Sequence, residues 1–184
     1  MNKVLKSLLF LDGIFILAAG MLGPIYAIFV ERIGGDILDA SGAMAGFSLS
    51  FALIVFLVSR WEDHVKFKKR LIFTGYTLSA FAFLAYYFVG NPFELLLVQI
   101  LLGVSGAIVT PAYDAAYSLF LDKGKFASEW GAWETVNRAV TGVAAIIGGL
   151  IAFEFGFKIL FLVMFAISLP GMLIAYSLLK KSNF

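Results

Sequence analysis

Residues 129–142, EWGAWETVNRAVTG, place Glu134, Asn137 and Arg138 inside a stretch that is long and apolar enough to cross a membrane. Glu134, Asn137, Arg138 and Thr141 recur at i, i+3, i+4 and i+7, so a helix would carry them on one face. A charge at such a depth is unfavourable unless it has a partner or water. This polar face must therefore turn away from lipid.

A second polar stripe lies on the preceding apolar stretch. Its members alternate by four and three residues: Gln99, Gly103, Gly106, Thr110, Tyr113 and Tyr117. Asp114 lies at the edge of this stripe, and Asp12 interrupts the first apolar stretch. Counted at about 1.5 Å per residue from the nearer cytoplasmic ends, Asp12, Asp114, Glu134 and Arg138 lie roughly 8–14 Å deep. The two stripes are predicted to line one cavity.

The residue types indicate ion or proton coupling in this layer. We expect Arg138 to face Glu134 one turn away and one of the aspartates across the cavity, which leaves another carboxylate able to take up and release protons. Alternatively, the pair on one helix neutralises itself and only holds helices together. Asp12 and Asp114 have no basic residue one turn away. The candidate substrate and coupling residues are Asp12, Gln99, Tyr113, Asp114, Glu134, Asn137 and Arg138.

The elements that position these residues are membrane spans. Of the 184 residues, 61% are hydrophobic and 14% charged, and the mean hydropathy of +0.96 is that of an integral membrane protein. The fold class is therefore an all-α membrane protein with one domain over residues 1–184. Six apolar runs of bilayer length lie near residues 5–29, 41–59, 71–89, 93–120, 129–153 and 158–179. Pro24, Pro111 and Pro170 are expected to bend their spans.

The chain has no Cys and a single His, which excludes disulfides and thiolate metal sites and leaves no set of zinc ligands. We expect no cofactor. A membrane enzyme finds little support, because the His lies in a loop and no nucleophile, base and orienting acid are assembled.

Basic residues predict the orientation of the spans. Eleven Lys and Arg residues flank one side, whereas Arg32 and Lys158 flank the other. Because Lys and Arg are retained in the cytoplasm, both termini are predicted to be cytoplasmic in a multi-pass protein of the inner (plasma) membrane. The bias argues against dual topology. It also accounts for the run KFKKR without a nucleic-acid partner, which we do not expect. The first run is too long for a signal peptide and is predicted to be the first span.

A weak internal repeat relates the two halves of the chain at an offset of 87 residues, with units of about 1–90 and 91–184. Pro24 and Tyr26 match Pro111 and Tyr113. Three spans per unit is an odd number, so the second unit crosses the membrane in the opposite sense. A 3+3 inverted repeat of this kind is typical of secondary transporters.

Several stretches resemble one six-helix half of a major facilitator superfamily transporter. VQILLGVSGAIVTPAYDAAYSLFLDKGKFASEWG is similar to that family's fourth span and the following loop, and GVAAIIGGLIAFEFGFKILF to its fifth-span glycine stretch. The resemblance implies that spans one and four line the cavity, that spans two and five meet the other half, and that spans three and six face outward. The last point agrees with the lack of Asp, Glu, Lys and Arg within the apolar cores of runs three and six, which indicates lipid-facing helices.

The segment SRWEDHVKFKKR stands where the family has its signature loop. The resemblance assigns Asp63 to the signature acid and Lys68, Lys69 and Arg70 to the basic end, as a gating loop. Ser59 and His64 replace the usual Gly and Arg of that motif. Gln99 stands where the family often has an Arg linked to proton coupling, so another group must serve if protons are used here.

These observations predict a secondary active transporter of a small molecule, working by alternating access in a lipid bilayer as a parallel homodimer and coupled to protons or another ion. The alternatives are a non-transporting membrane partner or assembly subunit, and one half of a heterodimeric transporter. Small residues on spans two and five are expected to form the dimer contact: Ser41, Ala45, Ser48 and Ala52, with Thr141, Ala145, Gly148 and Ala152.

Overall fold

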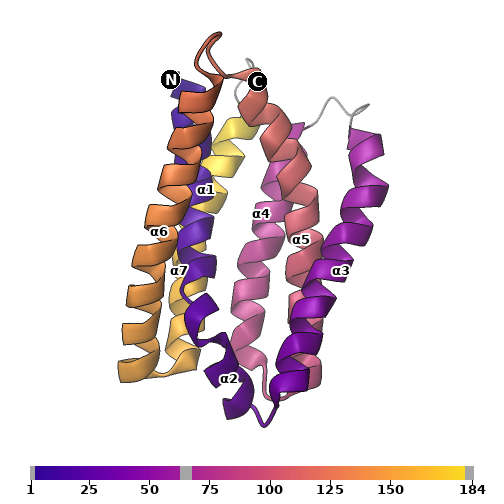
Figure 1. Cartoon of the computed structure of the whole chain (residues 1–184), viewed down its shortest axis with the longest axis vertical. Helices are drawn as coiled ribbons and strands as arrows, with labels where there is room; N and C mark the ends of the chain where they lie inside the picture. The colour runs from indigo at the N-terminus through magenta and orange to yellow at the C-terminus, as the bar shows by residue number, and fades with distance from the viewer. Residues whose placement is uncertain (1–2, 63–67, 181–184) are drawn as a thin grey trace.

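The computed structural model describes residues 3–62 and 68–180, which form helices joined by short turns (Figure 1). Six helical stretches are long and apolar enough to cross a membrane, as the sequence predicted. The first comprises α1 (Lys3–Gly20), a 3-10 turn η1 (Gly23–Ile25) and α2 (Tyr26–Arg32). The others are α3 (Ile37–Glu62), α4 (Lys68–Ala85) with the 3-10 turn η2 (Tyr86–Phe88), α5 (Pro92–Leu119), α6 (Phe126–Phe155) and α7 (Phe157–Lys180).

Local chemistry explains the interruption of the first span and the start of the fourth. Pro24 has no backbone N–H to donate and lies where the helix gives way to η1. Pro111 and Pro170, in contrast, lie inside continuous helices. The helix α5 begins at a cap in which Asn91 Oδ1 accepts a hydrogen bond from the backbone N–H of Glu94 (3.0 Å). The Glu94 carboxylate accepts one in return from the backbone N–H of Gly90 (2.7 Å).

The spans pack as two groups joined at the back of the bundle. In Figure 1, α6 and α1 lie on one side, α5 and α3 on the other, and α7 and α4 behind them. Each group is held by close helix pairs, α1 with α6 and α7 in one and α5 with α3 and α4 in the other, and α4 packs on α7. By comparison, α1 and α5 make little contact. Both chain ends lie at the same end of the bundle, as an even number of spans requires.

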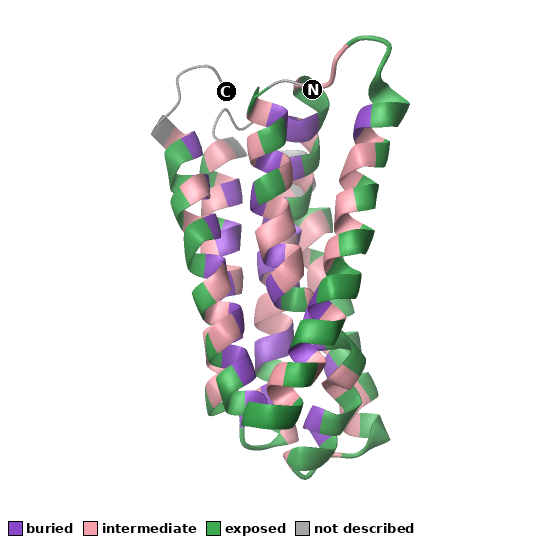
Figure 2. Cartoon of the chain, turned by 90° about the vertical axis from the view of Figure 1, so that its left-hand side faces the viewer, coloured by how far each residue is buried: buried purple, intermediate pink, exposed green. Residues whose placement is uncertain are grey.

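Burial is uneven among the spans. Within the apolar segments, 6% of the residues in α3 and 11% of those in α6 are buried, against 33–44% in the other four spans. Figure 2, seen from the side that carries α6, shows mostly exposed and half-buried residues. Spans three and six are α4 and α7, which pack on each other and have 39% and 33% of their residues buried. That their remaining surface faces lipid stays a prediction. The least covered helices are α3 and α6.

Glycines allow the closest helix approaches. A Cβ atom at Gly103 of α5 would collide with the side chain of Ser50 and the backbone carbonyl of Phe47 on α3. Gly148 of α6 is buried, and a Cβ atom there would collide with the backbone of Met21. The predicted contact stripe on span five is therefore wrong at Gly148, which packs against the first span of its own chain rather than against a second copy.

This packing predicts different results for two adjacent glycines. Gly148→Ala should lower the thermal stability of the purified protein, because the new methyl group meets the backbone of Met21, which cannot rotate away as a side chain could. Overpacking of this kind costs about 1–3 kcal/mol. Gly149→Ala is the matched control, since nothing lies within 4 Å of the added atom. Thermal unfolding in detergent, followed by size-exclusion chromatography, measures both. Equal melting of the two variants would contradict the packing.

Candidate functional site

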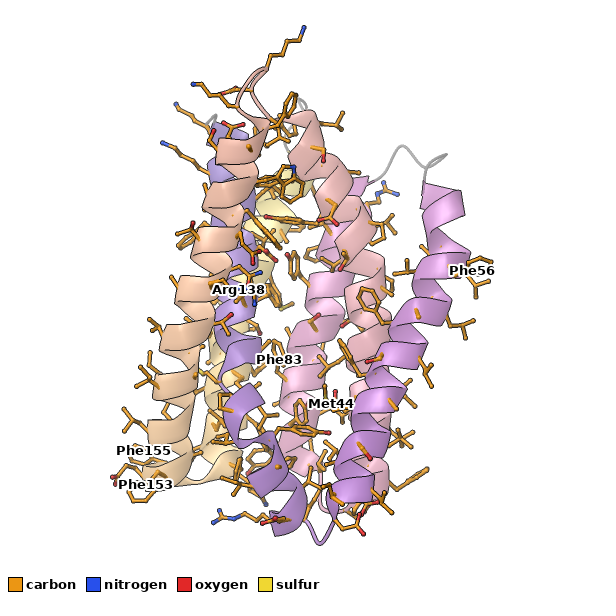
Figure 3. All side chains as sticks on the ribbon, in the orientation of Figure 1. Met44, Phe56, Phe83, Arg138, Phe153 and Phe155 are labelled. Carbon is orange, nitrogen blue, oxygen red and sulfur yellow. The ribbon has the colours of Figure 1, made fainter. Side chains whose placement is uncertain are left out.

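A cavity of about 650 Å³ lies between the two helix groups, with walls from α1, α3, α4, α5 and α7. Most of its lining is apolar and aromatic, and Asp12 lies on its wall. Figure 3 shows two of the lining residues, Met44 on α3 and Phe83 on α4, directed toward the middle of the bundle. Gln99 also lines the cavity, where it is buried and its Nε2 lies 3.8 Å from the sulfur of Met44.

Asp12 is held by two neutral hydrogen-bond donors. The hydroxyl of Tyr76 on α4 donates to Oδ1 (2.8 Å), and the indole N–H of Trp133 on α6 donates to Oδ2 (2.8 Å). One carboxylate thus joins three helices from both groups. Among the described residues, neither Asp12 nor Asp114 forms an ion pair with Arg138, so the expected ion pair across the cavity is not present.

An aromatic cluster surrounds these donors. The ring of Phe15 stacks on Tyr76 with centroids 4.2 Å apart. Trp133 meets Trp130 edge to face at 5.8 Å, and Trp130 lies 4.8 Å from Tyr117. Sequence reasoning missed Tyr76 and Trp133, because aromatic residues in membrane spans are usually packing residues. The available signal was that both can donate hydrogen bonds at the depth of a buried carboxylate.

Glu134 and Arg138 form the predicted pair one turn apart. The Nε of Arg138 donates to Oε1 of Glu134 at 2.7 Å, and the two side chains are 48% (Glu134) and 78% (Arg138) exposed. Figure 3 shows Arg138 midway along α6, directed toward the front of the bundle. Asn137 is half-buried beside them, and its backbone carbonyl accepts the hydroxyl of Thr141 (2.8 Å). A paired but exposed charge therefore lies at mid-span.

Tyr113 and Asp114 are neighbours on α5 with opposite environments. Tyr113 is buried, stacks on Tyr117 with centroids 5.9 Å apart, and has no hydrogen-bond partner for its hydroxyl among the described residues. Asp114 is exposed and close enough to Asp12 for the two carboxylate charges to interact. The structure thus brings Asp12, Tyr113 and Asp114 into one region, while Gln99 lies elsewhere on the cavity wall.

The gating-loop assignment stays a prediction. Asp63 lies outside the described residues. The helix α4 begins at Lys68 and continues through Lys69 and Arg70, at the end of the bundle that carries both chain termini.

Six membrane-length helices, five of which line a cavity with a carboxylate on its wall, are typical of a membrane transporter. A family model described as Major Facilitator Superfamily matches residues 8–183, and the chain belongs to that superfamily. The resemblance seen in the sequence and the half-bundle fold are thereby confirmed.

Two relatives are similar to most of the chain. The uncharacterized MFS-type transporter MJ1560 of Methanocaldococcus jannaschii is 25% identical over 91% of this chain, which spans 43% of that protein. The uncharacterized MFS-type transporter YitZ of Bacillus subtilis is 25% identical over 78% of this chain, and the match covers 87% of YitZ. The chain thus spans less than half the length of the first relative and most of the second.

Proposed function

We propose that this six-helix unit works in secondary active transport of a small molecule, by alternating access and with coupling to protons or another ion. The observation that carries the proposal is the placement of Asp12. A carboxylate that served only to hold helices together would be expected to face a cation or be fully enclosed. Asp12 instead lies on the wall of a 650 Å³ cavity and is bound by two neutral donors.

Alternating access requires a second bundle against which the first can rock. Two features support such a partner on the front of this unit: the exposed pair of Glu134 and Arg138 at mid-span, and the sparse burial of α3 and α6. We take the partner to be a second, parallel copy of this chain, whose two-fold axis runs along the membrane normal. A heterodimeric partner is the alternative.

The packing also supports the proposed inverted repeat. Such a repeat relates α1 to α5, α3 to α6 and α4 to α7, so the pair of α3 with α5 corresponds to the pair of α6 with α1. Both pairs are present. The pair of α4 with α7 corresponds to itself and is also present. We assign the end of the bundle that carries both termini to the cytoplasmic side of the inner (plasma) membrane, in line with the basic residues there.

Transport in proteoliposomes tests the proposed function. Purified protein in sealed liposomes, under an imposed pH gradient, should accumulate at least one member of a broad solute panel above the level in protein-free liposomes. A protonophore should abolish the accumulation. If folded protein accumulates no solute under a gradient in either direction, the chain is better explained as a non-transporting partner.

A disulfide cross-link tests the homodimer. Ala45 on α3 is exposed, and a side chain at Gly149 on α6 meets no atom within 4 Å, so Ala45→Cys and Gly149→Cys are both tolerable. The two positions lie at similar depth, since they are 8 residues from the start of α3 and 6 residues from the end of α6. Mild oxidation of the double variant should produce a covalent dimer. The absence of native Cys keeps the result free of other cross-links.

The matched control places cysteines at Phe81 on α4 and Leu162 on α7, which are 53% and 39% exposed. These positions lie at similar depth on the helices that should face lipid. The Phe81→Cys and Leu162→Cys variant should stay monomeric on a denaturing gel. A dimer from this control, without one from the variant on α3 and α6, would contradict the proposed interface.

A further inference from the structure

We propose that the cavity binds a lipophilic organic cation, with Asp12 as its counter-charge. The inference rests on the proposed function, because it names the substrate class for the same cavity. Three properties of the cavity carry it: the sign of its charge, the scarcity of free hydrogen-bonding groups and the density of aromatic rings.

The charge in the cavity is negative. Among the described residues that line it, Asp12 is the only acidic or basic side chain; the lining includes no Lys, Arg or His. A cation entering this low-dielectric site would gain attraction to the carboxylate, whereas an anion would be repelled. Tyr76 and Trp133 each donate to a different oxygen of Asp12, which fixes the carboxylate and leaves each oxygen free to accept a further bond.

The remaining polar groups are few for a sugar-like substrate, and two of them are already paired. The hydroxyls of Ser79 and Ser105 hydrogen-bond each other (2.9 Å). Ser105 also bonds the carbonyl of Leu102 on its own helix (2.9 Å). Gln99, Thr110 and the hydroxyls of Tyr26 and Tyr86 are the other polar side-chain groups of the lining. A ligand rich in hydroxyls would lose its water without gaining enough partners.

Aromatic rings from both helix groups surround the space. Six line it: Phe15, Tyr26, Phe47, Phe51, Phe83 and Tyr86. The faces of such rings attract cations, and their apolar area accommodates a bulky hydrophobic body. The methionines Met44 and Met164 add flexible, polarisable contacts. A volume of about 650 Å³ lies within the range of roughly 300–1,000 Å³ that suits drug-sized ligands.

A pair of probes with the same shape and opposite charge tests the inference. Tetraphenylphosphonium and tetraphenylborate both carry four phenyl groups around a central atom. Their saturable binding to the full chain in lipid nanodiscs, corrected for empty nanodiscs, is measured by equilibrium dialysis. We expect the cation to bind at least 10-fold more tightly than the anion. Equal affinity, tighter binding of the anion, or no saturable binding of the cation would overturn the inference.

Variants locate the charge that selects the cation. Asp12→Asn should weaken tetraphenylphosphonium binding at least 10-fold. Glu154→Gln, which makes the same charge change at an exposed residue outside the cavity, should leave the affinity unchanged. Unchanged affinity in folded Asp12→Asn would overturn the role of this carboxylate. If that variant does not fold, the comparison of the two probes on the wild-type chain still shows whether the cavity selects a cation.

Failure of this inference can be told apart from failure of the proposed function. Transport of panel solutes without binding of tetraphenylphosphonium would overturn the cationic substrate and retain the transporter. Selective binding of the cation, with no transport of it or of any panel solute, would support the ligand class and overturn the transport function.

Discussion

Asp12→Asn is expected to reduce gradient-driven accumulation in proteoliposomes to the level of protein-free liposomes, while the chain remains folded. The substitution keeps the size of the side chain and one of the two oxygen acceptors that Tyr76 and Trp133 use. The lost bond to a charged acceptor costs about 1.5–3 kcal/mol, offset in part because a neutral amide is easier to bury. What disappears entirely is the ability to hold a proton or face a cation.

Two companion variants sharpen this prediction. Asp114→Asn in the same assay shows whether the exposed carboxylate near Asp12 shares the coupling role. Glu154→Gln, exposed at the far end of α6, controls for a general change of charge and should transport normally. Uphill transport at the wild-type rate by both aspartate variants would show that the coupling assignment is wrong.

Arg138→Gln is expected to destabilise the assembled protein, because it leaves the carboxylate of Glu134 without its partner at 2.7 Å. Where a second six-helix unit covers the pair, an uncompensated charge costs about 3–5 kcal/mol. Where water covers it, the pair is worth about 1 kcal/mol or less. Thermal unfolding of the purified protein measures the difference. Stability and transport equal to the wild type would contradict a covered pair.

The double variant Glu134→Gln with Arg138→Gln separates two roles for the pair. Both charges are removed together, so the penalty of an unpaired carboxylate disappears and folding should recover. Recovery of transport as well would favour a pair that only holds helices together. Recovered stability with no transport would assign the pair to substrate binding or coupling.

The six spans could be predicted because bilayer thickness fixes the length of an apolar helix. Their ends were less certain: α6 begins at Phe126, three residues before the predicted run, since helices continue into the polar interface. The orientation of each helix about its axis could not be read from composition. Gly148 was assigned to an outer contact for this reason, although it packs against Met21.

The acidic residues of the candidate site were found from the sequence because charges inside apolar helices are rare. Their partners were not. Tyr76 lies on a span without Asp, Glu, Lys or Arg in its apolar core, and Trp133 lies beside, not on, the polar face of its helix. Only the tertiary arrangement of α1, α4 and α6 brings their donors to Asp12. A contact between three spans depends on tertiary geometry that residue spacing along one helix does not contain.

Access to the cavity from both sides of the membrane tests alternating access most directly. Ala19 is exposed and lines the cavity, so a cysteine there reports whether a membrane-impermeant thiol reagent can enter. Glu31→Cys and Lys123→Cys, at opposite ends of the bundle, serve as controls in right-side-out and inverted vesicles. We predict that Ala19→Cys reacts from both sides, Glu31→Cys only from outside and Lys123→Cys only from the cytoplasmic side. Reaction of Ala19→Cys from one side only, under imposed gradients of either direction, would contradict transport by alternating access.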